Sequence, residues 1–162
     1  MIHEDYSIIN GQSYYDFNQY GSVLSNSMDL NLKYNFSNMK LDMSYNYTDM
    51  LDLEYNNSIN GVSRHSFNSH ISTELQSLQF NVNLFYRYVG KKIVESRDPN
   101  TFEFIGLTIP DYGIWKVTIS KNNLFKIINF SIGIDNLFDY VNKDDPSSIN
   151  PGRTYYISME VG

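Results

Sequence analysis

The sequence predicts an all-β protein, an antiparallel up-and-down transmembrane β-barrel segment of about eight strands. Three observations lead to this prediction. Apolar and polar residues alternate in several segments, the connections between these segments are short and long in turn, and aromatic residues gather near the segment ends. Strict alternation indicates strands, because successive side chains of a strand point to opposite faces of a sheet.

Composition sets the limits of this prediction. The 162 residues are enough for one domain, and we expect residues 1–162 to form a single β-barrel segment without a plug domain. Ala is absent while Asn and Tyr are abundant, which suits strands and polar loops. A formal net charge of -6 and the lack of a basic tract argue against a nucleic-acid partner. Without Cys, disulfides and thiolate metal sites are excluded.

The first clear strands are "MDLNLKYNF" (28–36) and "MKLDMSYNYT" (39–48), in which every second residue is apolar or aromatic. The short polar step at Ser37–Asn38 between them predicts a β-hairpin. A weaker strand, "SFNSHISTEL" (66–75), leads through Gln76–Ser77 into "LQFNVNLFYRY" (78–88). Later strands are predicted at residues 114–120, 127–135 and 153–161.

The segment at residues 78–88 raises the question of which face meets water. One face is apolar, and we expect it to face lipid through Leu78, Phe80, Val82 and Leu84. The other face is polar apart from Phe85. Residues of the polar parity would line the wet interior of the barrel: Asp29, Lys33, Lys40, Asp42, Asn81, Asn83, Arg87 and Glu160.

Loop lengths favour a membrane barrel over a soluble one. Connections at Ser37–Asn38, Gln76–Ser77 and Asn122–Asn123 are tight, and they alternate with long polar connections at 49–61, 90–110 and 138–151. Outer-membrane barrels have short periplasmic turns and longer extracellular loops. The strands have roughly the 9 to 11 residues that a tilted strand needs to cross a bilayer. Aromatic residues sit where interfacial girdles would lie: Tyr34, Phe36, Tyr45, Tyr47, Tyr86, Tyr88, Trp115 and Tyr155.

The carboxyl end, "FSIGIDNLFDYVNKDDPSSINPGRTYYISMEV", resembles the closing hairpin of TonB-dependent outer-membrane receptors. In that family an Asn-Leu-Phe-Asp-like stretch ends the penultimate strand, and a Pro-Gly-Arg opens the last one. The matching residues here are Asn136, Leu137, Phe138, Asp139, Pro151, Gly152 and Arg153. Short polar side chains such as Asn and Asp bond to nearby backbone where strands end, so this motif is predicted to be structural.

The resemblance covers roughly residues 20–162 and implies a transport function. The family takes up scarce solutes such as iron chelates, cobalamin or glycans, with a plug domain and TonB as partners and outer-membrane lipid around the barrel. A whole member has a barrel of roughly 22 strands. The N-terminus "MIHEDYSIING" has no basic and apolar signal regions, which implies an N-terminal truncation of an outer-membrane protein. The end at Val161–Gly162 departs from the aromatic terminal residue common in the family.

The sequence predicts no catalytic residue, cofactor or metal site. No phosphate-binding glycine loop, nucleophile elbow or metal-ligand cluster is present. His65 and His70 are five residues apart, so on one strand they would point to opposite faces. Acidic groups in the long loops lack EF-hand spacing, which favours solvated loops: Asp49, Asp52, Glu54, Asp144 and Asp145.

Two other interpretations remain open. About eight strands can close into a stand-alone small outer-membrane barrel with a structural or adhesive role. A soluble ligand-binding barrel of lipocalin type would instead need an apolar interior and a polar exterior.

Overall fold

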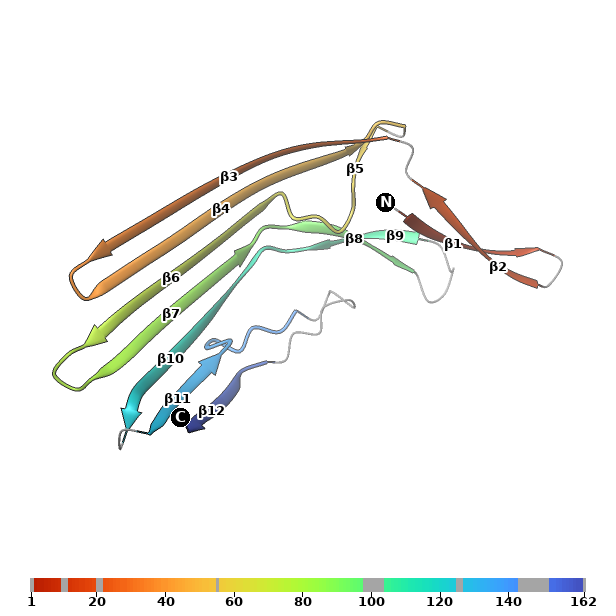
Figure 1. Ribbon diagram of the computed structural model, residues 1–162. Helices are drawn as coiled ribbons and strands as arrows, with labels where there is room; N and C mark the ends of the chain where they lie inside the picture. The colour runs from red at the N-terminus through yellow and green to blue at the C-terminus, as the bar shows by residue number, and fades with distance from the viewer. Residues whose placement is uncertain are drawn as a thin grey trace.

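A computed structural model describes residues 2–9, 12–19, 22–54, 56–97, 104–124, 127–142 and 152–161. Within these residues all regular elements are β-strands (Figure 1). They contain no helix that is both long and apolar enough to cross a membrane.

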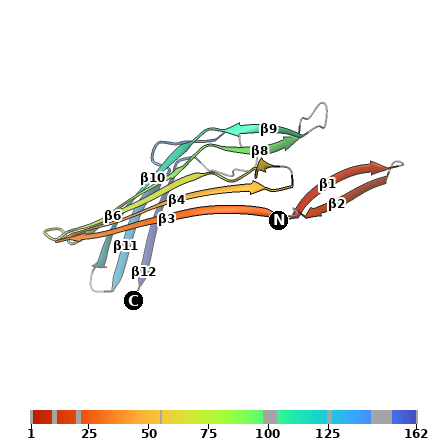
Figure 2. The ribbon, with the colours of Figure 1, turned by 90° about the horizontal axis from the view of Figure 1, so that it is seen from above.

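The main sheet has seven long antiparallel strands that pair in chain order, which confirms the all-β antiparallel class. A two-residue strand, β5 (Asn57–Ser58), pairs with β4 and makes the sheet eight-stranded. Figure 2 shows that the sheet curves, with β11 and β12 turned away from β3 and β4. The long strands are β3 (Val23–Phe36), β4 (Met39–Asp52), β6 (His65–Leu75), β7 (Phe80–Val89), β10 (Tyr112–Leu124), β11 (Ile128–Asp135) and β12 (Thr154–Val161).

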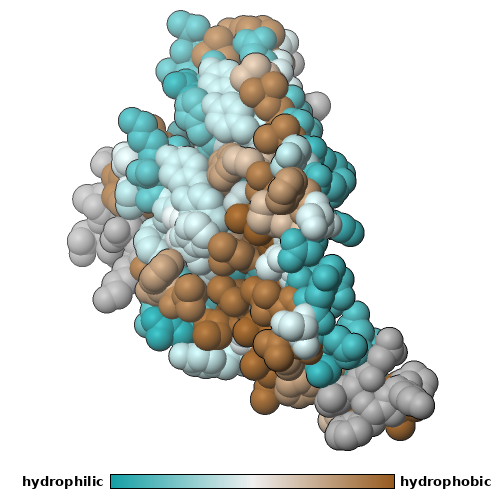
Figure 3. All heavy atoms as spheres, turned by 90° about the vertical axis from the view of Figure 1, so that its left-hand side faces the viewer, coloured by the Kyte–Doolittle hydropathy of each residue, from teal (hydrophilic) through white to brown (hydrophobic). Residues whose placement is uncertain are grey.

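The register of these pairs gives the sheet one apolar and one polar face. A continuous apolar row crosses all seven long strands through directly paired residues: Tyr34, Leu41, Ile71, Leu84, Val117, Ile134 and Tyr155. The next row on the same face repeats the pattern: Phe36, Met39, Thr73, Val82, Ile119, Ile132 and Ile157. Figure 3, which looks at the end with the short turns, shows apolar side chains gathered in a band.

The protein does not cover this apolar face with a core of its own. Among the described residues the buried hydrophobic side chains are only Ile59, Val89 and Ile109. Leu30 is 56% exposed on β3 and Ile157 is 75% exposed on β12. An apolar surface of this extent indicates contact with something outside the chain, since soluble monomers rarely leave such patches open.

Two strand ends differ from the sequence prediction at the short turns. Strand β7 begins at Phe80 because Gln79 adopts a left-handed φ of 56°, so Leu78 lies in the turn, where its N–H donates to the Leu75 carbonyl at 3.0 Å. Strand β10 continues through Leu124, past the turn predicted at Asn122–Asn123, with a register shift after Lys121. Alternation of side chains cannot reveal either feature, because a turn residue can continue the pattern of its strand.

The opposite end of the sheet contains strands where the sequence predicted loops. The segment at 90–110 holds a hairpin of β8 (Lys92–Arg97) and β9 (Phe104–Ile109). This hairpin extends the β7–β10 pair beyond the main sheet. It is joined to the 56–64 segment by a hydrogen bond, in which the Gly61 N–H donates to the Ile93 carbonyl of β8 at 2.6 Å. Burial of Ile59 and Ile109 accompanies this contact. A further hairpin of β1 (Ile2–Ile9) and β2 (Gln12–Gln19) precedes the main sheet.

Hydrogen bonds from two short side chains organise the exit from β11. Asn136, 3% exposed with φ 52°, accepts from the Tyr140 N–H at 2.9 Å and donates to the Tyr140 carbonyl at 2.7 Å. Asp139 accepts the Arg153 N–H at 2.6 Å, which joins this turn to the start of β12. A hydrogen bond to the Tyr155 side chain and the charge of Asp139 raise the pKa of Arg153.

The other motif residues have separate places around this turn. The Leu137 N–H donates to the Trp115 carbonyl at 2.9 Å, whereas Phe138 is 69% exposed. A Cβ on Gly152 would meet the carboxylate of Asp139 at 2.5 Å, so a side chain here would displace that carboxylate from the Arg153 N–H. Pro151 lies outside the described residues.

A glycine on β11 allows an aromatic side chain to lie flat across the polar face. The ring of Tyr156 on β12 occupies the space above Gly133, where a Cβ would overlap it. There its hydroxyl bonds to the Thr118 hydroxyl at 2.5 Å, and the Lys116 ammonium lies 5.0 Å from the ring centre.

Replacing Gly133 with Ala should displace the Tyr156 ring and lower the free energy of unfolding by about 1–3 kcal/mol. Urea unfolding of the protein folded in detergent micelles would measure it. Gly106→Ala is the matched control, because its added Cβ meets only Ile93, at the ordinary distance of 3.4 Å. Adding Tyr156→Ala to Gly133→Ala should remove most of the glycine effect. An undiminished effect in the double variant would contradict this account.

Replacing Asn136 with Ala removes both bonds to Tyr140 and leaves a non-glycine residue at positive φ, so stability should fall by about 2–3 kcal/mol. Asn136→Gly loses the same bonds but tolerates the backbone conformation, and should cost about 1 kcal/mol less. Asn35→Ala, at an exposed β3 position, should change the unfolding free energy by under about 0.5 kcal/mol. Equal effects of the Ala and Gly variants at position 136 would refute the backbone part of the argument.

Candidate functional site

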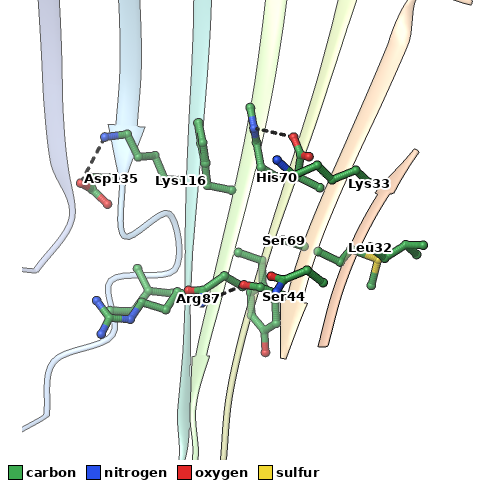
Figure 4. Close-up of a pocket in the computed structure, with 15 residues that line it drawn as sticks. Leu32, Lys33, Ser44, Ser69, His70, Arg87, Lys116 and Asp135 are labelled. Carbon is green, nitrogen blue, oxygen red and sulfur yellow. Dashed lines mark hydrogen bonds and ion pairs between the residues drawn. The ribbon is translucent and has the colours of Figure 1, made fainter. Parts of the chain in front are cut away.

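The polar face of the sheet is hollowed over a volume of about 540 Å³. Five long strands, β3, β4, β6, β7 and β10, and the end of β11 supply its lining (Figure 4). All of these strands belong to one sheet. The hollow is therefore a concave part of the polar face of that sheet, and the sheet's curvature and the sizes of the side chains set its shape. The polar-face side chains at this hollow are Asn31, Lys33, Asp42, Ser44, Asn68, His70, Phe85, Arg87, Ile114, Lys116 and Asp135.

One row of paired positions carries most of the charge in the hollow. In strand order it contains Lys33, Asp42, His70, Phe85 and Lys116, and Asp135 at the end of β11 lies beside Lys116. At one end of the row the Lys116 ammonium lies 3.7 Å from the Asp135 carboxylate (Figure 4). These two opposite charges largely offset each other.

His70 is fixed at the middle of that row by three neighbours. Its Nε2 lies 3.1 Å from the Asn83 Oδ1, and its Nδ1 lies 3.9 Å from the Asp42 carboxylate. Its ring stacks on Phe85 with centroids 4.1 Å apart and planes 3° from parallel. Asp42 therefore lies between two neighbours, His70 on β6 and its register partner Lys33 on β3.

The adjacent row places Arg87 in a neutral polar setting. Its paired positions are Asn31, Ser44, Asn68, Arg87 and Ile114. The Asn68 amide donates to the Ser44 hydroxyl at 3.4 Å. Within the described part of the chain, Arg87 and Lys33 have no ion pair and no side-chain hydrogen bond. The Arg87 side chain extends away from His70 and Lys33 (Figure 4).

The register brings together residues that the sequence could assign only by parity. All eight residues of the predicted interior set lie on the face that contains the hollow, but only Lys33, Asp42 and Arg87 of that set line it. Lys116 and Asp135 also line the hollow, although neither belongs to the predicted interior set. Alternation gives the face of each residue, but their meeting depends on the register of β10 against β11, which the sequence does not show.

The remaining candidate residues lie apart from the hollow. His65 is on the apolar parity, opposite to His70, and its Nδ1 lies 2.8 Å from the Tyr45 hydroxyl. Asp49 pairs with Arg64 at 2.8 Å, and Asp52 accepts the Glu54 N–H at 2.8 Å. The described residues contain no group of three His, Cys, Asp or Glu side chains suited to a metal ion. Asp144 and Asp145 lie outside them.

Comparison with solved structures gives the same fold in three receptors or transporters. The siderophore receptor PirA from Acinetobacter baumannii aligns with a TM-score of 0.71 and 19% identity, over 98% of this chain and 26% of PirA. FpvA from P. aeruginosa, solved in a pyoverdine–iron complex, gives 0.72 and 11%, over 98% and 22%. The copper transporter OprC gives 0.70 and 18%, over 98% and 26%. This chain therefore spans about a quarter of the length of these structures.

Sequence comparison identifies the family. No curated protein matches the chain. A family model described as "TonB dependent receptor-like, beta-barrel" matches residues 3–137, which is most of the chain. The match agrees with the antiparallel sheet of the structure. This chain belongs to the TonB-dependent receptor β-barrel family.

Proposed function

We propose that this chain forms the C-terminal part of the barrel wall of a TonB-dependent receptor that imports a scarce solute across the outer membrane. The observation that carries the proposal is the pair of apolar rows across all seven long strands, on a sheet whose described residues bury almost no core. In lipid such a face is stable, whereas in water it would drive aggregation. Residues 1–162 then form one barrel segment, bounded by outer-membrane lipid.

The lipid-facing residues follow from the same rows. Val82 and Leu84 lie within them, and Phe80 shares their parity at the start of β7. Leu78, in the preceding turn, would reach the membrane boundary at the periplasmic end. Lys121, on the apolar face nearby, supports a boundary there, because its ammonium turns to the Leu78 carbonyl at 3.3 Å and lies 5.0 Å from the Phe80 ring. Cationic side chains near strand ends commonly reach toward headgroups in this way.

Strand parity supports a wall segment over a stand-alone small barrel. Seven long antiparallel strands leave β3 and β12 running in the same direction, so pairing them would introduce a parallel ladder. Single-chain bacterial barrels have an even number of antiparallel strands. Within the described residues, the outer edges of β3 and β12 are unpaired, and open edges are not tolerated in lipid. Further strands of a larger barrel would satisfy both edges.

Membership of this family implies three partners for transport. A plug domain would fill the barrel, TonB would relay energy, and a small solute would be the cargo. Iron chelates, cobalamin and glycans are the solute classes to test, and the siderophore and copper proteins with the same fold give metal-bearing solutes priority. The wall would contribute binding and shape, without catalysis.

Replacing Val82 with Arg should lower the free energy of unfolding by about 1–2 kcal/mol, because Val82 lies two residues inside the boundary at Phe80 and the cost of a lipid-facing Arg falls toward the interface. The neighbouring variant Asn81→Arg places the same charge on the polar face and should cost far less. Urea unfolding in phospholipid vesicles measures both. Equal losses would contradict the assignment of the two faces.

Deleting the gene should abolish uptake of one solute class, and disabling TonB in the parent cells should have the same effect. Radiolabelled ferric chelates, copper, cobalamin and oligosaccharides, supplied at limiting concentrations, would measure uptake. Restoring the gene must restore uptake. Unchanged uptake across the whole panel would refute a transport role and favour a structural barrel.

A further inference from the structure

We propose that a second pocket, at the end of the sheet with the long connections, binds the phosphomonoester headgroup of a membrane lipid through Arg64 and Lys91, with Lys92 beside them. This inference rests on the membrane placement in the proposed function, because a lipid reaches the pocket only if the apolar face lies in lipid. The pocket shares no lining residue with the hollow on the polar face.

The pocket has a volume of about 320 Å³ and lies where three segments meet, namely the end of β4, residues 58–64 and the base of the β8–β9 hairpin. Backbone hydrogen bonds join these segments. The Ile59 N–H donates to the Met50 carbonyl at 3.0 Å, and the Gly61 N–H donates to the Ile93 carbonyl at 2.6 Å. Figure 1 shows β5 leaving the end of β4 in the direction of β8.

Aromatic side chains on the apolar face place the pocket at the depth of lipid headgroups. Tyr45, Tyr47 and His65 lie on this face, and Tyr47 and His65 are register partners. Asp49 is the next residue of the same parity on β4, and Arg64 immediately precedes His65. Aromatic belts mark the boundary between hydrocarbon and headgroups. Asp49 and Arg64, which both line the pocket, therefore lie just beyond that boundary on the side of the wall that faces lipid.

The lining of the pocket is basic, although the chain as a whole has a formal net charge of -6. Among the described residues it contains three cations, Arg64, Lys91 and Lys92, and one carboxylate, Asp49, which leaves a formal charge of +2. Lys91 is exposed and forms no ion pair with a described residue. A phosphomonoester carries about -1.5 to -2 at neutral pH, so it matches this charge better than a singly charged group does.

Arg64 is held in the pocket by two bonds that leave part of its donor set free. Its Nε lies 2.8 Å from the Asp49 carboxylate, and its Nη2 donates to the Ser58 hydroxyl at 2.7 Å. A guanidinium has five N–H donors, and the Arg64 side chain is 53% exposed, so further donors can meet phosphate oxygens. The Thr108 hydroxyl lines the same pocket and adds a neutral donor.

Continuity with the apolar face favours a lipid over a free phosphate. From Asp49 toward the short turns, the residues of β4 on this face are Tyr47, Tyr45, Met43 and Leu41. A lipid whose headgroup sits in the pocket would lay its acyl chains against this strip. A soluble phosphate would make no such contact, so the apolar strip should add affinity only for the lipid.

Native mass spectrometry of the protein as cells produce it, extracted in detergent, tests the proposal by counting bound lipids. Dioleoyl phosphatidic acid, a phosphomonoester lipid, should bind at least about tenfold more tightly than dioleoyl phosphatidylcholine. Lys91→Gln should weaken phosphatidic acid binding at least about threefold, and a double variant with Lys92→Gln at least about tenfold. Arg64 stays unchanged in these variants, because it also pairs with Asp49.

Lys40→Gln is the matched control, because Lys40 is an exposed cation on the polar face, near the short turns and outside the pocket. It should leave phosphatidic acid binding unchanged. No phosphatidic acid binding by the parent protein, equal losses in Lys91→Gln and Lys40→Gln, or equal binding of the two lipids would each overturn the inference. Glycerol 3-phosphate that binds as tightly as phosphatidic acid would indicate a soluble phosphate ligand and overturn the lipid assignment. Retained gel mobility shift on heating shows that each variant is folded.

These measurements need neither TonB nor transport, so the two proposals can fail separately. Lys91-dependent binding of phosphatidic acid together with unchanged uptake in the deletion strain would support the lipid site and refute the transport role. TonB-dependent uptake without Lys91-dependent lipid binding would support transport and refute the lipid site.

Discussion

Cross-strand register is the constraint on which the rest of this structure depends. Side chains alternate between faces with a period of two, so a slip of one residue in any strand would move its apolar residues to the polar face. Here the register holds across seven strands, and Leu84 meets Val117 and Ile71 while Asn83 meets Thr118 and Ser72. The apolar rows and the charged hollow are two results of the same hydrogen-bonded ladder.

The scarcity of buried side chains among the described residues follows from this arrangement. In a soluble sheet, one face would pack against helices or a second sheet, and residues such as Leu30 and Ile157 would be buried. In this protein the sheet's stability must come from the backbone hydrogen bonds between strands and from contacts between neighbouring side chains on each face. The apolar face also needs an apolar environment outside the chain. The buried side chains Ile59 and Ile109 lie at the end with the long connections, beside the β8–β9 hairpin.

Glycines and short polar side chains stabilise the sheet where a bulky ring crosses it or where a strand ends. Gly133 makes room for Tyr156, which ties β10 to β12 across β11. On the apolar face, Gly113 makes comparable room for Tyr86, whose ring centre lies 4.4 Å from that of Trp115. Asn136 and Asp139 replace the backbone bonds that β11 loses at its end. The two glycines thus let bulky rings lie against the sheet, and the two short polar side chains supply hydrogen bonds where the chain turns.

The sequence by itself determined the strand class, the two faces and the closing turn, because these depend on local alternation and on short-range bonds from residues such as Asn136. It could not place Leu78 in a turn or extend β10 to Leu124, since turn residues can continue a strand's pattern. It also could not find the β8–β9 hairpin, whose position depends on the β7–β10 pair and on the contact with the 56–64 segment. Only the tertiary structure decided which polar-face residues lie next to one another, because the sequence of a single strand does not show its register against the neighbouring strand. That register sets Lys116 against Asp135 and leaves Arg87 and Lys33 in the hollow without an ion pair among the described residues.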